Sequence, residues 1–326
     1  MPPFCVYNDR LYHIVVTGGG GMRHILPLNL RSQLTEISMD WDNLREIHLR
    51  CERPVIFCIG EKEYFLDKGE GLKEHPEKPY CVNMQEIQEC LAYICQYSLY
   101  AFENQIQKGY ITVRGGHRVG LSGQVVMGDR GVYSMSHLSS LNIRMAHSVK
   151  GCGEYIFPLL WKENRPCSTL IVSPPGHGKT TLLRDLIRLF SDGFNSFKGQ
   201  SVGLVDERFE IAACYQGIPQ NDVGMRTDVM ANCIKAVGVE MMVRSMAPKI
   251  IAFDELGTDE DIKAVQYAVH SGCIVVTTLH GSEWKDVVCH SVKGLFDRII
   301  FLNDWIENQR GFVIVDGNGL PVHKAV

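Results

Sequence analysis

The sequence predicts an α/β protein with a mainly parallel sheet, preceded by a smaller α+β domain. Two observations predict the parallel sheet. Apolar runs of strand length lie at residues 169–172, 202–205, 250–253 and 274–278, and helix-like stretches such as 180–190 and 259–271 separate them. Apolar strands that alternate with helices imply a parallel sheet covered on both faces.

Three segments are predicted along the chain. Four consecutive glycines, residues 18–21, predict a flexible N-terminal extension over residues 1–21, with Met22 as an alternative start. Residues 22–150 are expected to form the α+β domain, and residues 151–326 the α/β domain.

The α+β domain is expected to contain a helix over residues 86–108, where apolar residues recur at spacings of three and four. Asn83 followed by Glu86 resembles a capping box at its start, and Gly109 would end it. The other expected elements are an amphipathic segment at 25–34, strands at 47–50 and 54–59, a hairpin at 110–127, and a strand or linker at 138–149.

Composition excludes several classes of protein. With 45% apolar and 21% charged residues, the chain is an ordinary globular one, and 326 residues favour two domains. A formal net charge of -4 argues against indiscriminate nucleic-acid binding, so no nucleic-acid partner is expected.

Twelve cysteines without a Cys-x-x-Cys motif indicate thiols in a reducing cytoplasm. No apolar run reaches the length of a membrane span, so no direct membrane insertion is expected.

A phosphate-binding loop is the strongest chemical signal. It follows an apolar strand, opens a helix, and consists of Ser173, Pro174, Pro175, Gly176, His177, Gly178, Lys179, Thr180 and Thr181. Its backbone N–H groups would bind the β-phosphate of ATP, aided by the helix dipole. Lys179 would reach the β- and γ-phosphates, and the Thr180 hydroxyl would hold Mg²⁺. The alternative is an ordinary glycine turn before a helix.

Two adjacent carboxylates end the apolar strand at 250–253. Asp254 would support Mg²⁺ through its water shell, and Glu255 would polarise the attacking water. Such a strand end is weak evidence alone. It gains weight because it follows Lys179 within the same alternation of strands and helices.

Two further strand ends carry polar side chains that could meet the γ-phosphate, because ligands gather at the carboxyl ends of parallel strands. Asp206 and Glu207 follow one strand, with Asp206 as a further metal ligand and Glu207 near the metal in a catalytic role. His280 ends the other strand and would sense the γ-phosphate. The alternatives are a solvated strand end for the acidic pair and a structural role for the histidine.

Together these stretches resemble the secretion-type ATPase superfamily of type II and type IV secretion and pilus assembly. The matching residues are the acidic box Asp206-Glu207, the strand-terminal Glu255, the Thr277-Thr278-Leu279-His280 box, and Arg244 and Pro248 before the acidic strand. This resemblance implies a RecA-like ATPase domain that acts as a homo-hexameric ring.

Further stretches are similar to the sporulation stage III protein AA family of endospore-forming bacteria. They are residues 115–120, 141–144, 205–208 and 254–257, and the resemblance covers residues 22–326. It implies a cytoplasmic ATPase on the mother-cell side, peripheral to a membrane complex, with membrane-embedded stage III sporulation proteins as partners. Ser173 replaces the expected loop glycine and Phe253 is bulkier than expected, but neither change removes a catalytic group.

A ring implies an arginine supplied by a neighbouring subunit, because Mg²⁺ leaves charge on the γ-phosphate. Arg118 and Arg144 are favoured, since the N-terminal domain of such rings can pack over the adjacent site. Arg208, Arg226 and Arg244 are the other candidates, and each of the five could instead form a surface salt bridge. Two other functions stay open: a RecA-like motor that translocates nucleic acid, and a nucleotide-gated scaffold with little turnover.

Overall fold

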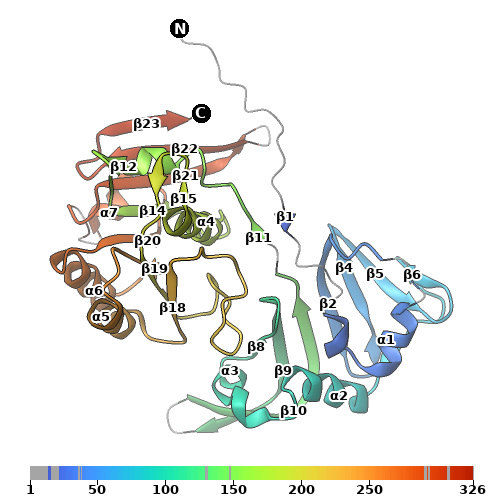
Figure 1. The fold of residues 1–326 in the computed structure, drawn as a ribbon. Coiled ribbons are helices and arrows are strands. Elements are labelled where there is room, and N and C mark those ends of the chain that lie inside the picture. Colours follow the sequence, from blue (N-terminus) through green and yellow to red (C-terminus); the bar gives the residue numbers. More distant parts are fainter. Residues whose placement is uncertain are drawn as a thin grey trace. The chain divides into compact units, whose positions relative to one another are not determined.

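The chain forms two compact units in a computed structural model (Figure 1). The structure describes residues 14–15, 22–35, 37, 39–128, 131–146, 148–289, 292, 294–306 and 309–325. The N-terminal unit contains residues 15–147 and 213–220. The second unit contains Ile14 and residues 148–212 and 221–326, and it is named the P-loop unit after the phosphate-binding loop expected in it. The expected extension, residues 1–21, lies outside the described residues except for β1 (Ile14–Val15).

The N-terminal unit is built on an antiparallel sheet, in which each strand pairs antiparallel with its neighbours. The strand order is β6 (Gly71–Lys73), β5 (Lys62–Asp67), β4 (Ile56–Ile59), β2 (Leu44–Arg50), β10 (Gly131–Arg144), β9 (Arg118–Gly128) and β8 (Tyr110–Thr112). The predicted hairpin is confirmed as β8 and β9, and the segment left open as strand or linker is strand over most of its length.

Three helices pack against this sheet and contribute to the core of the unit. They are α1 (Leu28–Thr35), α2 (Met84–Ile94) and α3 (Glu103–Gln107), and their buried residues Leu30, Ile87 and Ile106 pack with Ile47 and Ile143 of the sheet. Apolar residues at helical spacing thus face the apolar side of the strands, as an amphipathic pattern requires.

The expected helix over 86–108 is wrong in its length. Its start is confirmed, because the Glu86 N–H donates to Asn83 Oδ1 at 2.9 Å and the Asn83 N–H donates to Glu86 Oε2 at 3.0 Å. The helix ends at Ile94 because Gln96 and Tyr97 take left-handed backbone conformations with φ of 49° and 61°. A short 3₁₀ turn, η3 (Leu99–Phe102), then leads into α3.

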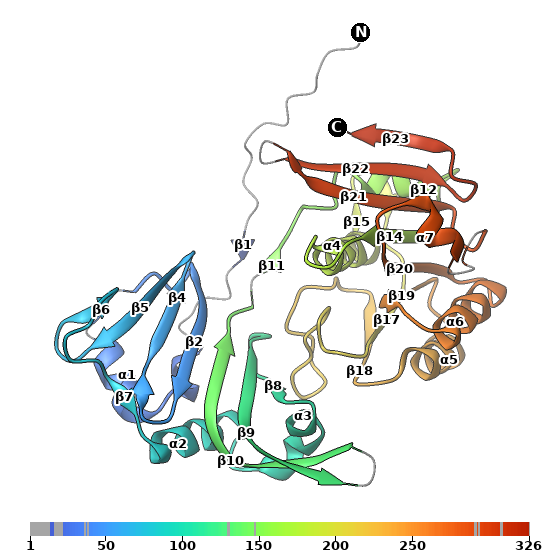
Figure 2. The ribbon, with the colours of Figure 1, turned by 180° about the vertical axis from the view of Figure 1, so that it is seen from behind.

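The P-loop unit contains the predicted mainly parallel sheet. The order is β18 (Thr227–Ala231), β17 (Val202–Asp206), β19 (Ile250–Leu256), β20 (Ile274–His280), β14 (Thr169–Ser173), β21 (Arg298–Ile306), β22 (Gln309–Asp316) and β23 (Pro321–Ala325). The strands from β18 to β21 pair in parallel, and β22 and β23 extend the sheet antiparallel (Figure 2). The carboxyl ends of four neighbouring strands, β17, β19, β20 and β14, therefore share one edge.

Four helices accompany this sheet among the described residues: α4 (Lys179–Asp192), α5 (Lys235–Met246), α6 (Asp259–His270) and α7 (Trp284–Cys289). Val239 of α5 and Val265 of α6 join Val205, Phe253 and Val275 of the strands in one buried cluster. This packing fixes the starts of α5 and α6 beside the strand ends.

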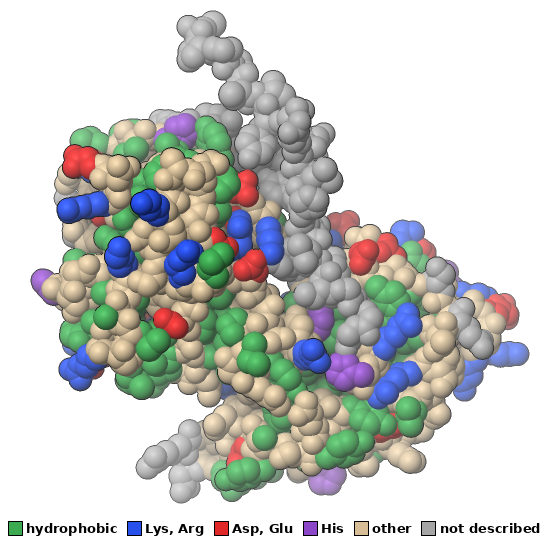
Figure 3. Space-filling model, in the orientation of Figure 1, with side chains coloured by type: hydrophobic (Ala, Val, Ile, Leu, Met, Phe, Trp, Pro, Cys, Tyr) green, Lys and Arg blue, Asp and Glu red, His purple; other side chains and the backbone are tan. Residues whose placement is uncertain are grey.

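Short elements complete the described chain. They are η2 (Arg23–Ile25), β3 (Arg53–Pro54), β7 (Cys81–Val82), β11 (Ser148–Val149), η4 (Phe157–Leu160), β12 (Trp161–Lys162), β13 (Arg165–Pro166), β15 (Gly193–Phe194) and β16 (Phe197–Lys198). Within the described residues, no helix combines the length and the apolar character needed to cross a bilayer. On the face drawn in Figure 3, Lys and Arg side chains are interspersed with Asp and Glu side chains.

The chain enters the N-terminal unit a second time. Residues 213–220, which connect β17 to β18 in sequence, belong to that unit. Tyr215 packs against its core, and the Tyr215 hydroxyl accepts a hydrogen bond from the Gln96 side chain at 2.6 Å. The Gly115 N–H donates to Gln220 Oε1 at 2.8 Å. These contacts make residues 213–220 a structural part of the N-terminal unit.

Gly238 of α5 permits close packing against β17, because a Cβ at this position would lie 2.6 Å from Val205 Cγ1. We expect Gly238→Ala to destabilise the protein by about 1–3 kcal/mol through overpacking. The measurement is the urea-unfolding midpoint, followed by circular dichroism. Val237→Ala, at the neighbouring exposed position, is the control and should shift the midpoint little. Equal midpoints for the two variants would contradict the packing argument.

Candidate functional site

The loop between β14 and α4 has the strand–loop–helix geometry of a phosphate-binding loop. Gly176 and Gly178 take left-handed conformations with φ of 78° and 71°, which glycine adopts without a steric cost. Lys179 and Thr180 open α4, so the first N–H groups of the helix face the loop. Ser173, at the position where a glycine was expected, ends β14 and is fully buried.

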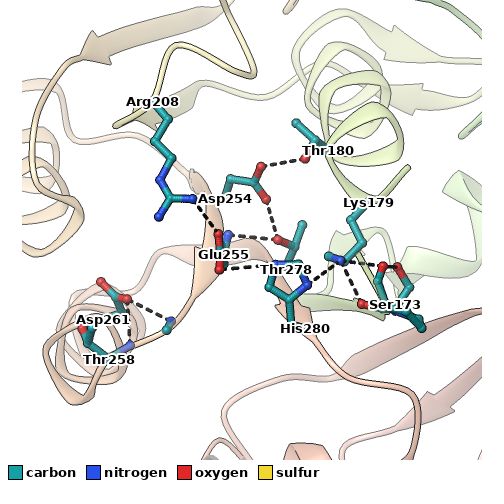
Figure 4. Close-up of polar contacts among 12 residues, drawn as sticks. Ser173, Lys179, Thr180, Arg208, Asp254, Glu255, Thr258, Asp261, Thr278 and His280 are labelled. Carbon is teal, nitrogen blue, oxygen red and sulfur yellow. Dashed lines mark hydrogen bonds and ion pairs between the residues drawn. The ribbon is translucent and has the colours of Figure 1, made fainter. Parts of the chain in front are cut away.

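Lys179 is directed back over this loop, as Figure 4 shows. Its ammonium group donates to the Ser173 carbonyl oxygen at 2.8 Å, the Pro174 carbonyl oxygen at 3.0 Å and Nδ1 of His280 at 3.0 Å. An ammonium has three protons to donate, and these contacts use all of them. The lysine and the predicted sensor histidine are therefore in direct contact.

Thr180 and Asp254 bring the expected metal-binding oxygens together. The Thr180 hydroxyl donates to Asp254 Oδ2 at 2.7 Å, and the Thr278 hydroxyl donates to Asp254 Oδ1. Asp254 lies on β19 and Thr278 on β20, so the parallel sheet holds the carboxylate against the start of α4. Hydroxyl and carboxylate oxygens are ligands of the kind that Mg²⁺ prefers, and the residues present fit this ion.

Glu255 lies in a bulge of β19. Phe253 pairs with Thr277 and Leu256 pairs with Leu279, so β19 carries one residue more than β20 in this interval. Glu255 has a φ of 54°, a left-handed conformation that costs a non-glycine residue about 1–3 kcal/mol. Its N–H donates to the Thr278 hydroxyl oxygen at 2.9 Å. Strain of this kind persists only where neighbouring groups hold it.

The Glu255 carboxylate has a cationic partner and a histidine partner. Nη1 of Arg208 lies 3.1 Å from Oε2, and Nε2 of His280 lies 3.3 Å from Oε1 (Figure 4). Because Nδ1 of His280 accepts from Lys179, the tautomer with its proton on Nε2 satisfies both histidine contacts. Lys179, His280 and Glu255 thus form a continuous chain of polar contacts.

Asp206 holds the loop that follows β17. It is 2% exposed, and its two carboxylate oxygens accept the N–H groups of Glu210 at 2.9 Å and Ala212 at 2.8 Å. Its expected role as a metal ligand stays a prediction. Glu207 contacts Nζ of Lys235 at 3.5 Å, and its catalytic role likewise stays a prediction.

Sequence reasoning missed two cations at this site. Arg184 of α4 donates from Nε to the Ile211 carbonyl oxygen at 2.7 Å, and burial lowers the pKa of its guanidinium while Asp206 and Asp254 oppose this shift. Arg184 lies one helical turn after Thr180, and this spacing could have indicated that its side chain lies near the site. Lys235 opens α5, a helix that was not predicted, so no motif marked it.

Charged side chains of the site line a small pocket. It is lined by Asp206, Glu207, Arg208, Glu210, Lys235, Asp254 and Glu255. Asp206 and Glu207 lie at the end of β17, Glu210 lies in the loop that follows, Asp254 and Glu255 lie on β19, and Lys235 lies at the start of α5.

The candidate arginines have different environments. Arg208 contacts Glu255 within the P-loop unit. Arg118 stacks on Tyr110 at 3.5 Å from the ring centroid, and Nε of Arg144 lies 3.3 Å from Glu46 Oε1, both in the N-terminal unit. The remaining candidates make local contacts, Arg226 with the Ser191 carbonyl oxygen and Arg244 with Glu240.

Solved structures share this fold. The ATPase DotB of Legionella pneumophila superposes with a TM-score of 0.56 at 15% sequence identity, over 92% of this chain and 81% of DotB. The pilus retraction motor PilT, solved with bound ADP, gives a TM-score of 0.56 at 16% identity, over 83% of this chain and 78% of PilT. The fold is therefore that of RecA-like secretion ATPases, and at these identities the likeness concerns the fold alone.

Sequence comparison gives the narrower relationship. Stage III sporulation protein AA of Bacillus subtilis (strain 168) is 38% identical over 279 residues, which cover 85% of this chain and 87% of that protein. The family model described as sporulation stage III, protein AA, matches residues 20–319, which include both units and every residue of the site described above. Because the family model matches nearly the whole length and the Bacillus subtilis relative is 38% identical over most of both chains, this chain belongs to the sporulation stage III protein AA family.

Proposed function

We propose that this protein binds Mg²⁺-ATP and hydrolyses it, as the motor of a secretion-like complex in endospore formation. One observation carries the proposal. The Thr180 hydroxyl of the phosphate-binding loop bonds to Asp254 at 2.7 Å, and Asp254 is followed directly by Glu255 in the strained bulge of β19. These three side chains thus lie beside the loop that would hold the phosphates, where they would serve as metal ligand, supporting carboxylate and general base.

The loop and the start of α4 are suited to the triphosphate. The N–H groups from Gly176 to Thr180 would donate to the β-phosphate, and Lys179 would leave its present carbonyl partners for the β- and γ-oxygens. Thr180 and Asp254 would hold Mg²⁺, with Asp206 and Glu207 as further carboxylates near it. Bound Mg²⁺ would neutralise charge on the β- and γ-phosphates.

Glu255 would orient the attacking water and accept its proton, an effect worth about 10²–10⁴ in rate. In the described structure its carboxylate is engaged by Arg208 and His280. Withdrawal of Lys179 toward the phosphates would free Nδ1 of His280, because the two are in contact at 3.0 Å. His280 could then turn toward the γ-phosphate and release Glu255, which links ATP binding to activation of the base.

We propose that a homo-hexameric ring completes the site, with Arg118 or Arg144 of one subunit serving the site of its neighbour. The two residues lie directly opposite each other on β9 and β10. Side chains in this position share one face of the sheet, and like charges there are destabilising. Glu46, whose Oε1 lies 3.3 Å from Arg144 Nε, offsets part of that repulsion, and an anion such as a γ-phosphate would offset more of it.

The ring would work in the cytoplasm on the mother-cell side, peripheral to a membrane complex. Its partners would be membrane-embedded stage III sporulation proteins, and ATP turnover would drive assembly or transport through them. Support comes from membership in a sporulation family and from a fold shared with secretion and pilus motors.

A nucleotide-gated scaffold is the second candidate function. It is favoured by the contacts of Arg208 and His280 with Glu255, which have to break before the base can act. A protein that keeps these contacts after binding ATP would change shape once and turn over little.

We expect Lys179→Ala to lose both Mg²⁺-ATP binding and phosphate release, because the loop loses its cation. Glu255→Gln should bind ATP like the parent but release phosphate about 10²–10⁴ times more slowly, since the amide is no base. The measurements are steady-state phosphate release and binding of a fluorescent ATP analogue. Lys263→Ala and Glu260→Gln, at exposed positions of α6, are matched controls. Binding by all variants without turnover by the parent would favour the scaffold.

A mixing experiment tests the shared site. Of Arg118→Ala and Arg144→Ala, the variant that removes the trans arginine should lower turnover by about 10³-fold or more. Co-expressed with Glu255→Gln, that variant should regain roughly a quarter of the parent rate, because half of the subunits keep Glu255 and half of their neighbours keep the arginine.

Co-expression of Lys179→Ala with Glu255→Gln is the control, because both changes lie in the same subunit's half of the site. This mixture should regain nothing. If neither arginine variant complements Glu255→Gln, the trans arginine lies elsewhere.

A further inference from the structure

Lys235 lines the acidic pocket and belongs to none of the sequence motifs. Its side chain is 12% exposed, so the ammonium group is largely removed from water. A charge in such a place is costly unless its surroundings compensate for it. The contacts of this one group therefore indicate what it does.

Three acceptors surround the Lys235 ammonium. It donates to the Glu255 main-chain carbonyl oxygen at 2.7 Å, and it lies 3.5 Å from Glu207 Oε2 and 3.4 Å from Asp261 Oδ2. These acceptors match the three protons of the ammonium. The shortest contact is the one to the Glu255 main chain.

Asp261, which lies near the Lys235 ammonium, forms hydrogen bonds with the residues that follow Glu255. Its Oδ2 accepts the N–H groups of Gly257 and Thr258, each at 3.0 Å, as the capping box of α6 (Figure 4). Lys235 thus fixes the Glu255 carbonyl directly and neutralises the carboxylate that fixes the next turn of the chain. On the other side, the Thr278 hydroxyl holds the Glu255 N–H.

We propose that Lys235 is a positioning residue for Glu255, a role that rests on the hydrolysis proposed above. The left-handed Glu255 is held between Thr278 at its N–H and Lys235 at its carbonyl. This main-chain conformation sets the direction of the side chain. Loss of Lys235 lets the bulge relax, and the carboxylate then leaves the place from which it reaches the water.

The proposal distinguishes Lys235 from a residue that only stabilises the fold or binds ATP. The contacts of the Lys235 ammonium within the described residues are to Glu255, Glu207 and Asp261, none of which belongs to the loop between β14 and α4. Loss of Lys235 should therefore affect the chemical step and leave nucleotide affinity intact. A misplacement of about 1 Å can cost about 10²-fold in rate.

Lys235→Met removes the ammonium and keeps an unbranched side chain of similar length. We expect kcat for phosphate release to fall about 10- to 100-fold, while KM and the Kd for Mg²⁺-ATP change less than about threefold. Lys263→Met, on the exposed side of α6, should match the parent. If Lys235→Met does not fold, Lys235→Met/Asp261→Asn, which removes a carboxylate left without its cation, takes its place.

A double variant tests whether Lys235 acts through Glu255. In a Glu255→Gln background, Lys235→Met should lower kcat by less than about twofold further, because the positioned base is already absent. Equal fold losses in both backgrounds, or a raised KM with unchanged kcat, would overturn the proposal.

A crystal structure of Lys235→Met separates this proposal from the proposed hydrolysis, since it needs no turnover. We expect Glu255 to leave the left-handed region, from its φ of 54° in the parent. A Glu255 that keeps this conformation without Lys235 would overturn the positioning role, whatever the parent's rate. A parent that releases no phosphate would end the hydrolysis proposal, and the Glu255 conformation would still decide the role of Lys235.

Discussion

The parallel pairing of β14 with β20 is the interaction on which the site depends. Its register places Ser173 opposite His280, so the first residue of the proposed phosphate-binding loop lies beside the histidine at the end of the next strand. Lys179 can then contact the Ser173 carbonyl and His280 at once. A shift of one residue would move His280 to the other face of the sheet, because side chains alternate along a strand.

The bulge in β19 is a second constraint on the site, in addition to the register of β14 and β20. It gives Asp254 and Glu255 separate tasks although they are neighbours in sequence: Asp254 contacts Thr180 at the start of α4, and Glu255 contacts His280 and Arg208. A regular strand would direct these side chains to opposite faces of the sheet. The extra residue is a local distortion that brings both carboxylates to one site.

Much of this arrangement could be predicted from the sequence because its signals are local. The loop around Lys179, the apolar strands and the polar residues at their ends are contiguous motifs, and the fold class followed from their alternation. Features set by long-range packing could not be predicted. Gln96 and Tyr97 end a helix in conformations that their residue types do not signal. Lys235 enters the site only through the packing of α5 on the sheet.

Residues 213–220 restrict how the two units can be exchanged between related proteins. They pack in the N-terminal unit, while the residues on either side of them belong to the P-loop unit. A chimera spliced once near residue 148 would therefore combine a foreign N-terminal unit with the Tyr215 and Gln220 of this chain, which contact this chain's own N-terminal unit. The two units are interleaved along the chain, so any exchange has to carry this short segment with the unit on which it packs.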